Sequence, residues 1–292
     1  MMWESIKGIA TSNFGWITDK YPEFFMTVKD NLPKADMKIA YRTYVSLVVM
    51  ISLVMFAVSI VVSFIALTII KTDILMRILY SIFASVFIAL STFLVFVFYP
   101  SQRIDQRKKD IDSNLPFVLT HMGAVAESGI PPYVIFKLIS RFKEYGEASK
   151  EMEKIVTNID TFGIDPLSSI KEVAGKTPSD SFKQVLLGFV TTTEAGGNIK
   201  TFLKAVGEQA LFEWRMKREK FLQQLDTVAE FYTGILIAAP LLLISLFAVM
   251  NMIQPTIAGF GVFDLMKMSI YIIVPALNIA FILFLGGIEV QI

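Results

Sequence analysis

The residues that could take part in chemistry are few, and Gly175-Lys176-Thr177 is the first group, because it matches the end of a phosphate-binding loop. Such a loop carries another glycine five residues before its last glycine, and it follows a β-strand. Ile170 occupies that position here, and no strand pattern precedes it. The stretch Gly196-Gly197-Asn198 lacks the spacing as well. We therefore expect a capped turn near Gly175 and no nucleotide site.

The remaining candidates for catalysis are one histidine and two glutamates. His121 is the only histidine and the chain has no cysteine, so a metal site of histidine and cysteine ligands cannot be assembled. Glu127 and Glu194 could form an acid/base pair, but each precedes a glycine break at a predicted helix end, which favours a structural or docking role. We predict no catalytic residue, no metal and no cofactor, and hence no enzyme.

Hydrophobic residues make up 54% of the chain, and they are concentrated in four runs without a charged residue. The runs are Thr43–Ile70, Ile78–Gln102, Phe231–Phe263 and Met268–Ile288. A helix needs about 20 apolar residues to cross a bilayer, and each run is that long. The alternative for each run is a buried core helix, and it is strongest for the fourth run, which holds Pro275 and Asn278. The third run exceeds one span, and its tail Gln254–Gly261 has the composition of a connecting loop.

Basic residues flanking the runs predict the orientation. They are frequent before the first run, after the second and before the third, and scarce in the two short connections. Because basic residues favour the cytoplasmic side, we expect both termini and the central segment in the cytoplasm, and a multi-pass protein in the plasma membrane. The net charge of +1 gives no general attraction to nucleic acid. The uncharged spans argue against an ion-coupled transporter.

The central segment, residues 103–230, shows helical periodicity throughout, with acidic and basic residues in equal number. Glycine and proline breaks divide it into about six helices, which predicts a small bundle. We expect Asp165 to cap a helix that starts at Pro166, and Thr177 to cap the next one with Asp180. The helix after Asn198 is expected to run unbroken into the third span.

The expected architecture is thus an all-α membrane protein with four transmembrane helices and a cytoplasmic helical bundle between spans 2 and 3. Its parts are an N-terminal segment (1–42), a first transmembrane hairpin (43–102), the bundle (103–230) and a second hairpin (231–292). The N-terminal segment mixes aromatic and charged residues, and it could be an interfacial amphipathic helix or a docking arm.

The breaks in the bundle carry a family resemblance. They are Leu115-Pro116, Glu127-Ser128-Gly129-Ile130-Pro131, Phe162-Gly163-Ile164-Asp165-Pro166 and Glu194-Ala195-Gly196-Gly197-Asn198. In this order, over about residues 103–253, they resemble the type II secretion F domain. That family comprises the platform proteins of type II secretion, type IV pili, Tad pili and the archaeal flagellum. One copy of the domain between two pairs of spans resembles the single-domain Tad type. Thr193 stands where many members have glycine, which weakens any functional role for Glu194.

The resemblance implies a non-enzymatic platform protein that couples a separate hexameric ATPase to insertion of pilin subunits into a filament. The implied partners are that ATPase, pilin-like subunits, the lipid bilayer, further copies of the chain and a second F-domain membrane protein. Alternatives are a membrane-anchored scaffold and a small transporter.

The candidate partner-binding residues fall in the two glycine turns and in the basic stretch after the second span. They are Glu127, Ser128, Gly129, Pro131, Glu194, Gly196, Gly197, Arg103, Arg107, Lys108 and Lys109. For the turn residues, the alternative role is helix-turn architecture. For the basic residues, the alternatives are topology determinants, contacts with anionic lipid and a surface that faces an acidic rim of the ATPase.

Overall fold

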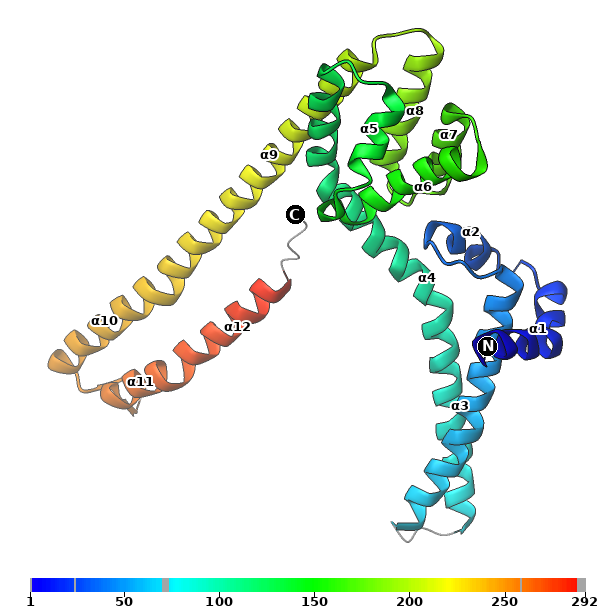
Figure 1. Ribbon diagram of the computed structural model, residues 1–292. Coiled ribbons are helices and arrows are strands. Elements are labelled where there is room, and N and C mark those ends of the chain that lie inside the picture. The colour runs from blue at the N-terminus through cyan, green and yellow to red at the C-terminus, as the bar shows by residue number, and fades with distance from the viewer. Residues whose placement is uncertain (1, 24, 70–73, 258, 288–292) are drawn as a thin grey trace. The chain divides into compact units, whose positions relative to one another are not determined.

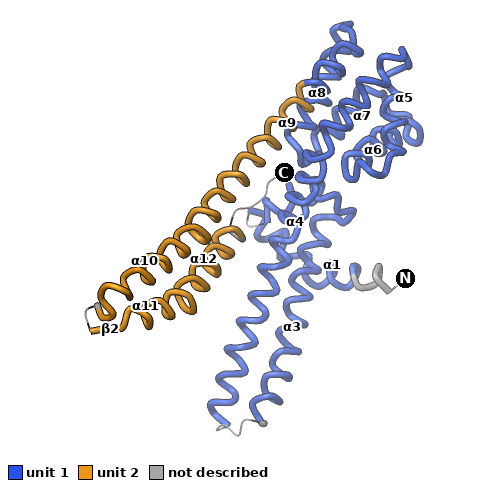
Figure 2. Tube along the Cα trace, turned by 90° about the vertical axis from the view of Figure 1, so that its left-hand side faces the viewer, with its two compact units in different colours: residues 1–208 blue, residues 209–292 orange. Residues whose placement is uncertain are grey.

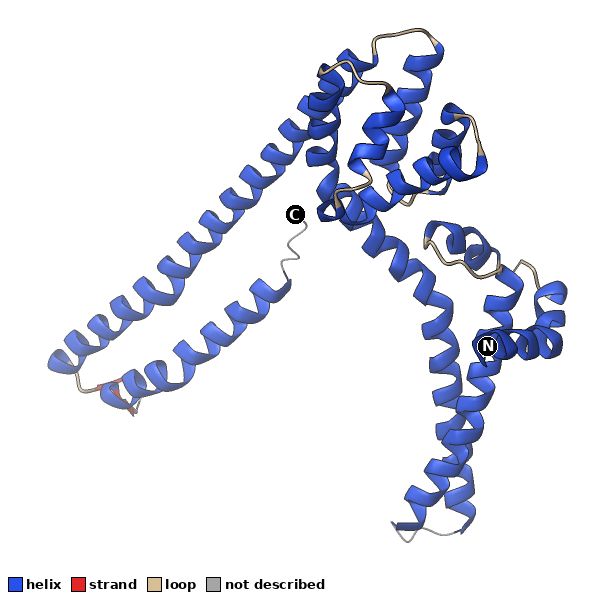
Figure 3. Ribbon diagram, viewed as in Figure 1, coloured by secondary structure: helices blue, strands red, loops and turns tan. Residues whose placement is uncertain are grey.

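The structure is a computed structural model, and it describes residues 2–23, 25–69, 74–257 and 259–287, most of them helical (Figure 3). Within these ranges, four helices are long and apolar enough to cross a membrane: Tyr41–Thr68, Ile74–Glu127, Ile199–Ile253 and Val262–Leu285. This confirms the predicted all-α class with four candidate spans. The chain forms two compact units, residues 1–208 and 209–292 (Figure 2).

The first unit begins with two helices that precede the first span: α1 (Met2–Lys20) and α2 (Met26–Lys34). The first span is α3 (Tyr41–Ile69), and it packs along α4 (Ile74–Glu127) (Figure 1). Helix α4 runs for 54 residues without a break, from the apolar hairpin to the far end of the bundle. It contains Pro100 and Pro116, each of which removes one backbone hydrogen bond. Both prolines are buried, so neighbouring helices cover these sites.

The bundle consists of the last turns of α4, the helices that follow it and the first turns of α9. These helices are α5 (Pro132–Ile139), the 3₁₀ turn η1 (Lys143–Tyr145), α6 (Gly146–Phe162), α7 (Pro166–Lys176), α8 (Asp180–Glu194) and α9 (Ile199–Phe231). In the described part of the chain, six α-helices therefore build the bundle, as predicted. Its core is apolar: the rings of Phe136 and Phe189 meet edge to face with centroids 5.1 Å apart, and Ile111, Met152 and Leu186 are buried as well. Burial of such side chains is the main stabilising term for a domain of this size.

Two glycines set how closely α4 and α9 approach each other. A Cβ atom on Gly207 of α9 would lie 3.0 Å from the carbonyl oxygen of Leu119 on α4. A Cβ atom on Gly123 would lie 3.4 Å from the carbonyl oxygen of Leu203. Since Leu203 is fully buried, the start of α9 is firmly seated on the end of α4.

The helix caps agree with the sequence at α7 and differ at α8. Asp165 caps α7 by accepting a hydrogen bond from the Ser168 amide at 3.0 Å, with Pro166 as the first residue, as predicted. Helix α8 is capped by Ser179, which accepts from the Phe182 amide at 3.0 Å, so the prediction of Thr177 as the cap is wrong. The Thr177 backbone is extended, and the chain turns into the helix only two residues later. Ser179 also donates to Asp112 of α4, and this bond joins the two helices.

The second unit continues α9 into a π-helical turn, η2 (Tyr232–Ala238), and then α10 (Ala239–Ile253). The helix after Asn198 therefore runs unbroken into the third candidate span, as predicted. The connecting loop forms a two-residue antiparallel pair, β1 (Thr256–Ile257) with β2 (Phe260–Gly261). The fourth candidate span comprises α11 (Val262–Met268), the π-helical turn η3 (Ser269–Ile273) and α12 (Val274–Gly287). Pro275 is the second residue of α12 and does not end the helix.

Candidate functional site: the distal turns and the Arg107 cluster

The two glycine turns of the bundle lie at the same end of it, at the tip of α4 farthest from the apolar hairpin (Figure 1). We call residues 127–131 and 194–198 the distal turns. Two lysines of α9 hold them close to each other. The Lys204 ammonium lies 2.9 Å from the Glu127 carboxylate, and the Lys200 ammonium donates to the Glu127 carbonyl oxygen at 3.3 Å. The tertiary structure thus brings together two motifs separated by more than sixty residues of sequence.

The geometry of the distal turns explains their glycines. Gly129 has a φ of 75° and Gly196 a φ of 68°, which are left-handed values that side chains other than glycine rarely adopt. The Ser128 hydroxyl donates to the Val125 carbonyl oxygen at 2.7 Å and ends α4, while Pro131 directly precedes α5. Asn198 starts α9 by accepting a hydrogen bond from the Thr201 amide at 3.2 Å. These residue types are therefore accounted for by the turn architecture.

The two glutamates of the distal turns do not form an acid/base pair. Each is bound by a lysine of a neighbouring helix: Glu127 by Lys204, and Glu194 by Lys171 at 2.6 Å. The hydrogen bond and charge of Lys204 lower the pKa of Glu127 below its ordinary value. A carboxylate held in its charged form suits electrostatic docking better than proton transfer near neutral pH.

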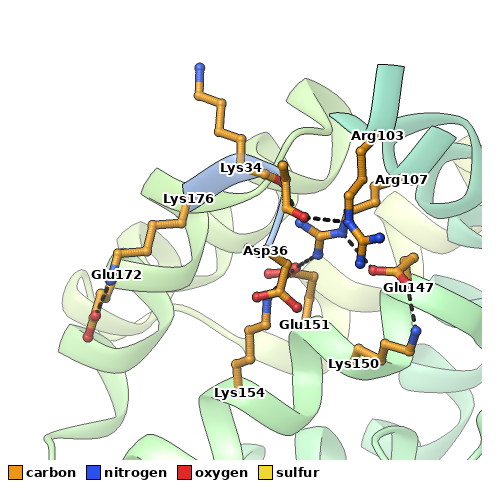
Figure 4. Close-up of polar contacts among 11 residues, drawn as sticks. Lys34, Asp36, Arg103, Arg107, Glu147, Lys150, Glu151, Lys154, Glu172 and Lys176 are labelled. Atoms are coloured by element: carbon orange, nitrogen blue, oxygen red, sulfur yellow. Dashed lines mark hydrogen bonds and ion pairs between the residues drawn. The ribbon is translucent and has the colours of Figure 1, made fainter. Parts of the chain in front are cut away.

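The other residues considered for chemistry have structural roles. The His121 ring packs on Phe142 with centroids 4.9 Å apart, and its Nδ1 lies 3.1 Å from the Tyr145 hydroxyl. Lys176 pairs with Glu172 at 2.6 Å and is the last residue of α7 (Figure 4). A phosphate would need the N-terminal end of a helix at this point, and the chain offers a C-terminal end. Among the described residues, no group of three or more histidine, cysteine, aspartate or glutamate side chains could hold a metal ion.

The basic residues after the second span divide into exposed and buried ones. Lys109 is exposed, and Lys108 is partly exposed with its ammonium 3.3 Å from Asp180. Arg103 is exposed, and its guanidinium donates to the Ala35 carbonyl oxygen at 2.9 Å. Arg107, in contrast, is only 3% exposed. The expectation that Arg107 contacts lipid or a partner is therefore wrong, because its guanidinium is already enclosed by the protein.

Arg107 is the centre of a buried polar cluster that joins three helices (Figure 4). From α4, it binds Glu147 at 2.7 Å and Glu151, both on α6, and it donates to the Lys34 carbonyl oxygen at the end of α2. Lys154 of α6 completes the cluster, with its ammonium 3.0 Å from Glu151 and 2.7 Å from Asp36. We call Arg107, Glu147, Glu151, Lys154, Asp36 and the Lys34 carbonyl the Arg107 cluster. It fastens the N-terminal segment to the bundle at the point where α4 leaves the apolar hairpin.

The charges of this cluster stabilise one another. Burial disfavours a charged Arg107, but the hydrogen bond that Arg107 donates to Glu147 and the charges of both carboxylates outweigh it, so the pKa of Arg107 is raised. Burial likewise raises the pKa of Glu147, and hydrogen bonds from Lys150 and Arg107 outweigh it, so the net pKa of Glu147 lies below its ordinary value. Three cations at the C-terminal end of α2, from Arg103, Arg107 and Lys154, also match the negative end of that helix dipole.

Sequence reasoning missed this cluster, although the sequence contains a signal for it. Arg107 is four residues before Ile111 and eight before Leu115, so it lies on the apolar stripe of α4. Glu151 stands next to Met152 and four residues before Ile155, on the buried side of α6. A basic and an acidic residue on facing apolar stripes indicate a buried ion pair.

Comparison with known proteins adds to this picture. Residues 118–247 match the family model described as type II secretion system (T2SS), protein F. Over this range, the chain is similar to protein F of the type II secretion system. The matched range contains both distal turns and lies inside the range over which the turn motifs resembled this family, so the resemblance is confirmed.

The curated relatives are archaeal. An uncharacterized protein of Methanocaldococcus jannaschii is 27% identical over 196 residues, which is 66% of this chain and 32% of the relative. The flagella accessory protein J of Methanococcus voltae is 23% identical over 60% of this chain and 30% of its own. The protein of that name from M. jannaschii is 25% identical over 47% of this chain and 24% of its own. The chain thus spans about a third or less of the relatives it matches, and no solved structure gives a significant match.

Two findings thus stand together: a similarity to protein F of the type II secretion system over residues 118–247, and four helices long and apolar enough to cross a membrane in the described part of the chain. Proteins of the protein F family are non-enzymatic membrane platform proteins, and this similarity agrees with the prediction that the chain is not an enzyme. In general, they work with assembly ATPases and pilin-like subunits.

Proposed function

We propose that this protein couples a separate cytoplasmic hexameric ATPase to the insertion of pilin-like subunits into a filament. The filament belongs to the class of type IV pili, Tad pili, archaella and type II secretion pseudopili. In this proposal, the bundle receives the movement of the ATPase and the candidate spans pass it to the subunit in the membrane. ATP is hydrolysed by the partner, and this chain contributes no nucleotide site.

One observation carries the proposal: two helices connect the bundle to apolar segments without a break. Helix α4 extends from Ile74 to Glu127, and α9 continues through η2 into α10. A helix rises about 1.5 Å per residue, so the part of α4 beyond Gln102 reaches about 38 Å from the end of the apolar run to the distal turns. A continuous helix transmits a displacement along its axis better than a flexible linker does. The protein F family match supports the same role.

The orientation of the bundle is the first part of the proposal to test. The chain has no cysteine, so a single introduced cysteine reports its own position without further changes. We expect Lys109→Cys to react with a membrane-impermeant maleimide only after cells are opened, and Gln254→Cys in the loop before β1 to react in intact cells. Labelling of Lys109→Cys in intact cells, with Gln254→Cys protected, would refute a cytoplasmic bundle.

The partner is the second part to test. We propose that the basic pair of the partly exposed Lys108 and the exposed Lys109 meets an acidic surface of the ATPase. The variant Lys108→Glu with Lys109→Glu is expected to lower co-purification of the ATPase with the full-length protein in detergent. A matched control replaces two other exposed lysines of the bundle, Lys143 and Lys183, with glutamate. Equal retention of the ATPase by both double variants would exclude this surface as the contact.

The requirement for this chain in filament assembly is tested by deletion. If the proposal is right, a strain without the protein retains ATPase activity but loses its filament or secreted substrate. Intact filaments in the deletion strain would reject the platform role. Solute flux through the purified protein in proteoliposomes would favour the transporter alternative.

A further inference from the structure

The first candidate span is longer than a bilayer requires, and protein covers its first turns. Helix α3 has 29 residues, whereas about 20 suffice to cross a bilayer. The first part of α3 is buried, including Tyr44, Val45, Leu47 and Val48, while Leu53, Val54 and Val58 farther along are exposed. Beyond its covered first turns, α3 has about 20 residues left up to Ile69, which is enough for the bilayer core.

The N-terminal helices provide this cover. Val28 and Leu32 of α2 and Phe25 directly before it pack on Tyr44 and Val45 of α3, together with apolar residues of α4. Polar contacts hold α1 beside the first turn of α3. The Arg42 guanidinium binds Asp19 at 2.7 Å, and the Thr11 and Thr43 hydroxyls are 3.4 Å apart. Helix α1 is therefore held beside the start of the hairpin, where the chain enters the apolar phase.

The face of α1 opposite this packing carries two large apolar side chains among polar ones such as Asn13 and Lys20. Ala10 and Thr18 are buried, whereas Ile9 and Trp16, seven residues apart and thus on one face, are each 56% exposed. Tyr21, just after α1, is 54% exposed. The Lys20 ammonium lies 5.9 Å from the Trp16 ring and 5.7 Å from the Tyr21 ring.

We propose that α1 lies in the membrane–water interface, with Ile9, Trp16 and Tyr21 in contact with the headgroup and upper acyl region of the phospholipid bilayer. The occupant of this face is lipid, because the face is continuous with a hairpin that itself enters the bilayer. Tryptophan and tyrosine prefer this depth, since their rings are apolar at one end and polar at the other. A lysine beside them extends its ammonium toward the phosphates. The proposal depends on the membrane location of the hairpin and not on the ATPase or pilin partners.

Tryptophan fluorescence of the full-length protein in lipid nanodiscs tests this proposal. The chain has three tryptophans, Trp3, Trp16 and Trp214. A variant with Trp3→Phe and Trp214→Phe leaves Trp16 as the only reporter. We expect its emission to be quenched by phosphatidylcholine brominated near the headgroup end of the acyl chain, and less by lipid brominated near the methyl end. Aqueous iodide should quench it weakly.

The matched control keeps Trp214, on the charged part of α9 beside Arg218, and replaces Trp3 and Trp16 with phenylalanine. Its emission should respond to iodide and not to brominated lipid. Strong iodide quenching of Trp16 without lipid quenching would overturn the proposal, because the face would then be in water. Absence of quenching by either agent would overturn it as well, because another protein surface would then cover the face.

Discussion

Replacement of Arg107 by methionine is the sharpest test of the Arg107 cluster, because it removes the charge and keeps most of the side-chain volume. Glu151 is almost fully buried and would lose its main cationic partner. Removing one partner of a buried ion pair costs about 3–5 kcal/mol. Lys154 remains 3.0 Å from Glu151, and Lys150 remains 2.6 Å from Glu147, so we expect the lower end of this range.

The expected loss can be measured as a thermal shift. For a domain of this size, 1 kcal/mol corresponds to about 2–4 °C, so a loss of about 3 kcal/mol lowers the unfolding midpoint by roughly 6–12 °C. Scanning fluorimetry and circular dichroism of the full chain in one detergent give this midpoint. The matched control is Lys108→Met, one residue along α4, whose ion pair with Asp180 is exposed. Its expected effect is below about 1 kcal/mol.

A double variant separates charge pairing from simple packing. Arg107→Met combined with Glu151→Met removes both charges of the tightest pair, and this replacement is often close to neutral. We expect the double variant to be more stable than Arg107→Met alone. The reasoning would be refuted if Arg107→Met matched Lys108→Met, or if the double variant lost the sum of two large single effects.

Three further predictions concern turns, packing and pH. Gly129→Ala forces a side chain into the left-handed region and should lower the free energy of unfolding by about 1–2 kcal/mol. Gly175→Ala, in open space near the end of α7, should instead raise it by up to about 1 kcal/mol, and equal thermal midpoints of the two variants would contradict this. Gly207→Leu should lower the free energy of unfolding by about 1–3 kcal/mol, because its Cβ would meet the Leu119 carbonyl of α4. Protease cleavage of α9 should become faster, and an unchanged digestion pattern would argue against this close packing. Because the pKa of Glu147 is lowered in the folded state, its ionisation stabilises the fold above the ordinary glutamate pKa of about 4.3, and this stabilisation is lost as the pH falls further. Acidification from about pH 5 to pH 3 should therefore lower the thermal unfolding midpoint of the unmodified protein more than that of Glu147→Gln, and parallel pH curves would rule this out.

Much of the architecture could be predicted because it depends on local patterns. An uncharged run as long as Thr43–Ile70 predicts a membrane helix from its length alone. Asp165-Pro166 specifies a helix start, since the aspartate side chain and the proline ring act within one turn. Prediction from neighbouring residues was wrong for the cap of α8, where both Thr177 and Ser179 are possible N-cap residues. The bond from Ser179 to the distant Asp112 accompanies the actual helix start.

The candidate partner-binding residues also separate into those that local sequence explains and those that tertiary packing places. The sequence identifies both glycine turns as breaks, but a list of turns does not say which of them meet. The tertiary structure brings the distal turns together, because Lys200 and Lys204 of α9 reach Glu127 of α4. It also removes Arg107 from the surface, although its neighbours Lys108 and Lys109 remain accessible.

The sequence by itself determined that this protein has four apolar helices, a helical bundle and turn motifs that resemble the type II secretion F domain, because hydropathy, periodicity and turn chemistry act over a few residues. Only the tertiary structure decided where the N-terminal segment belongs. Asp36 and the Lys34 carbonyl meet Arg107 and Lys154 across long stretches of chain, and these contacts exist only after α2, α4 and α6 have packed. A charge on an apolar stripe has two outcomes, a solvated residue or a buried pair, and the decision depends on whether the facing helix supplies the opposite charge.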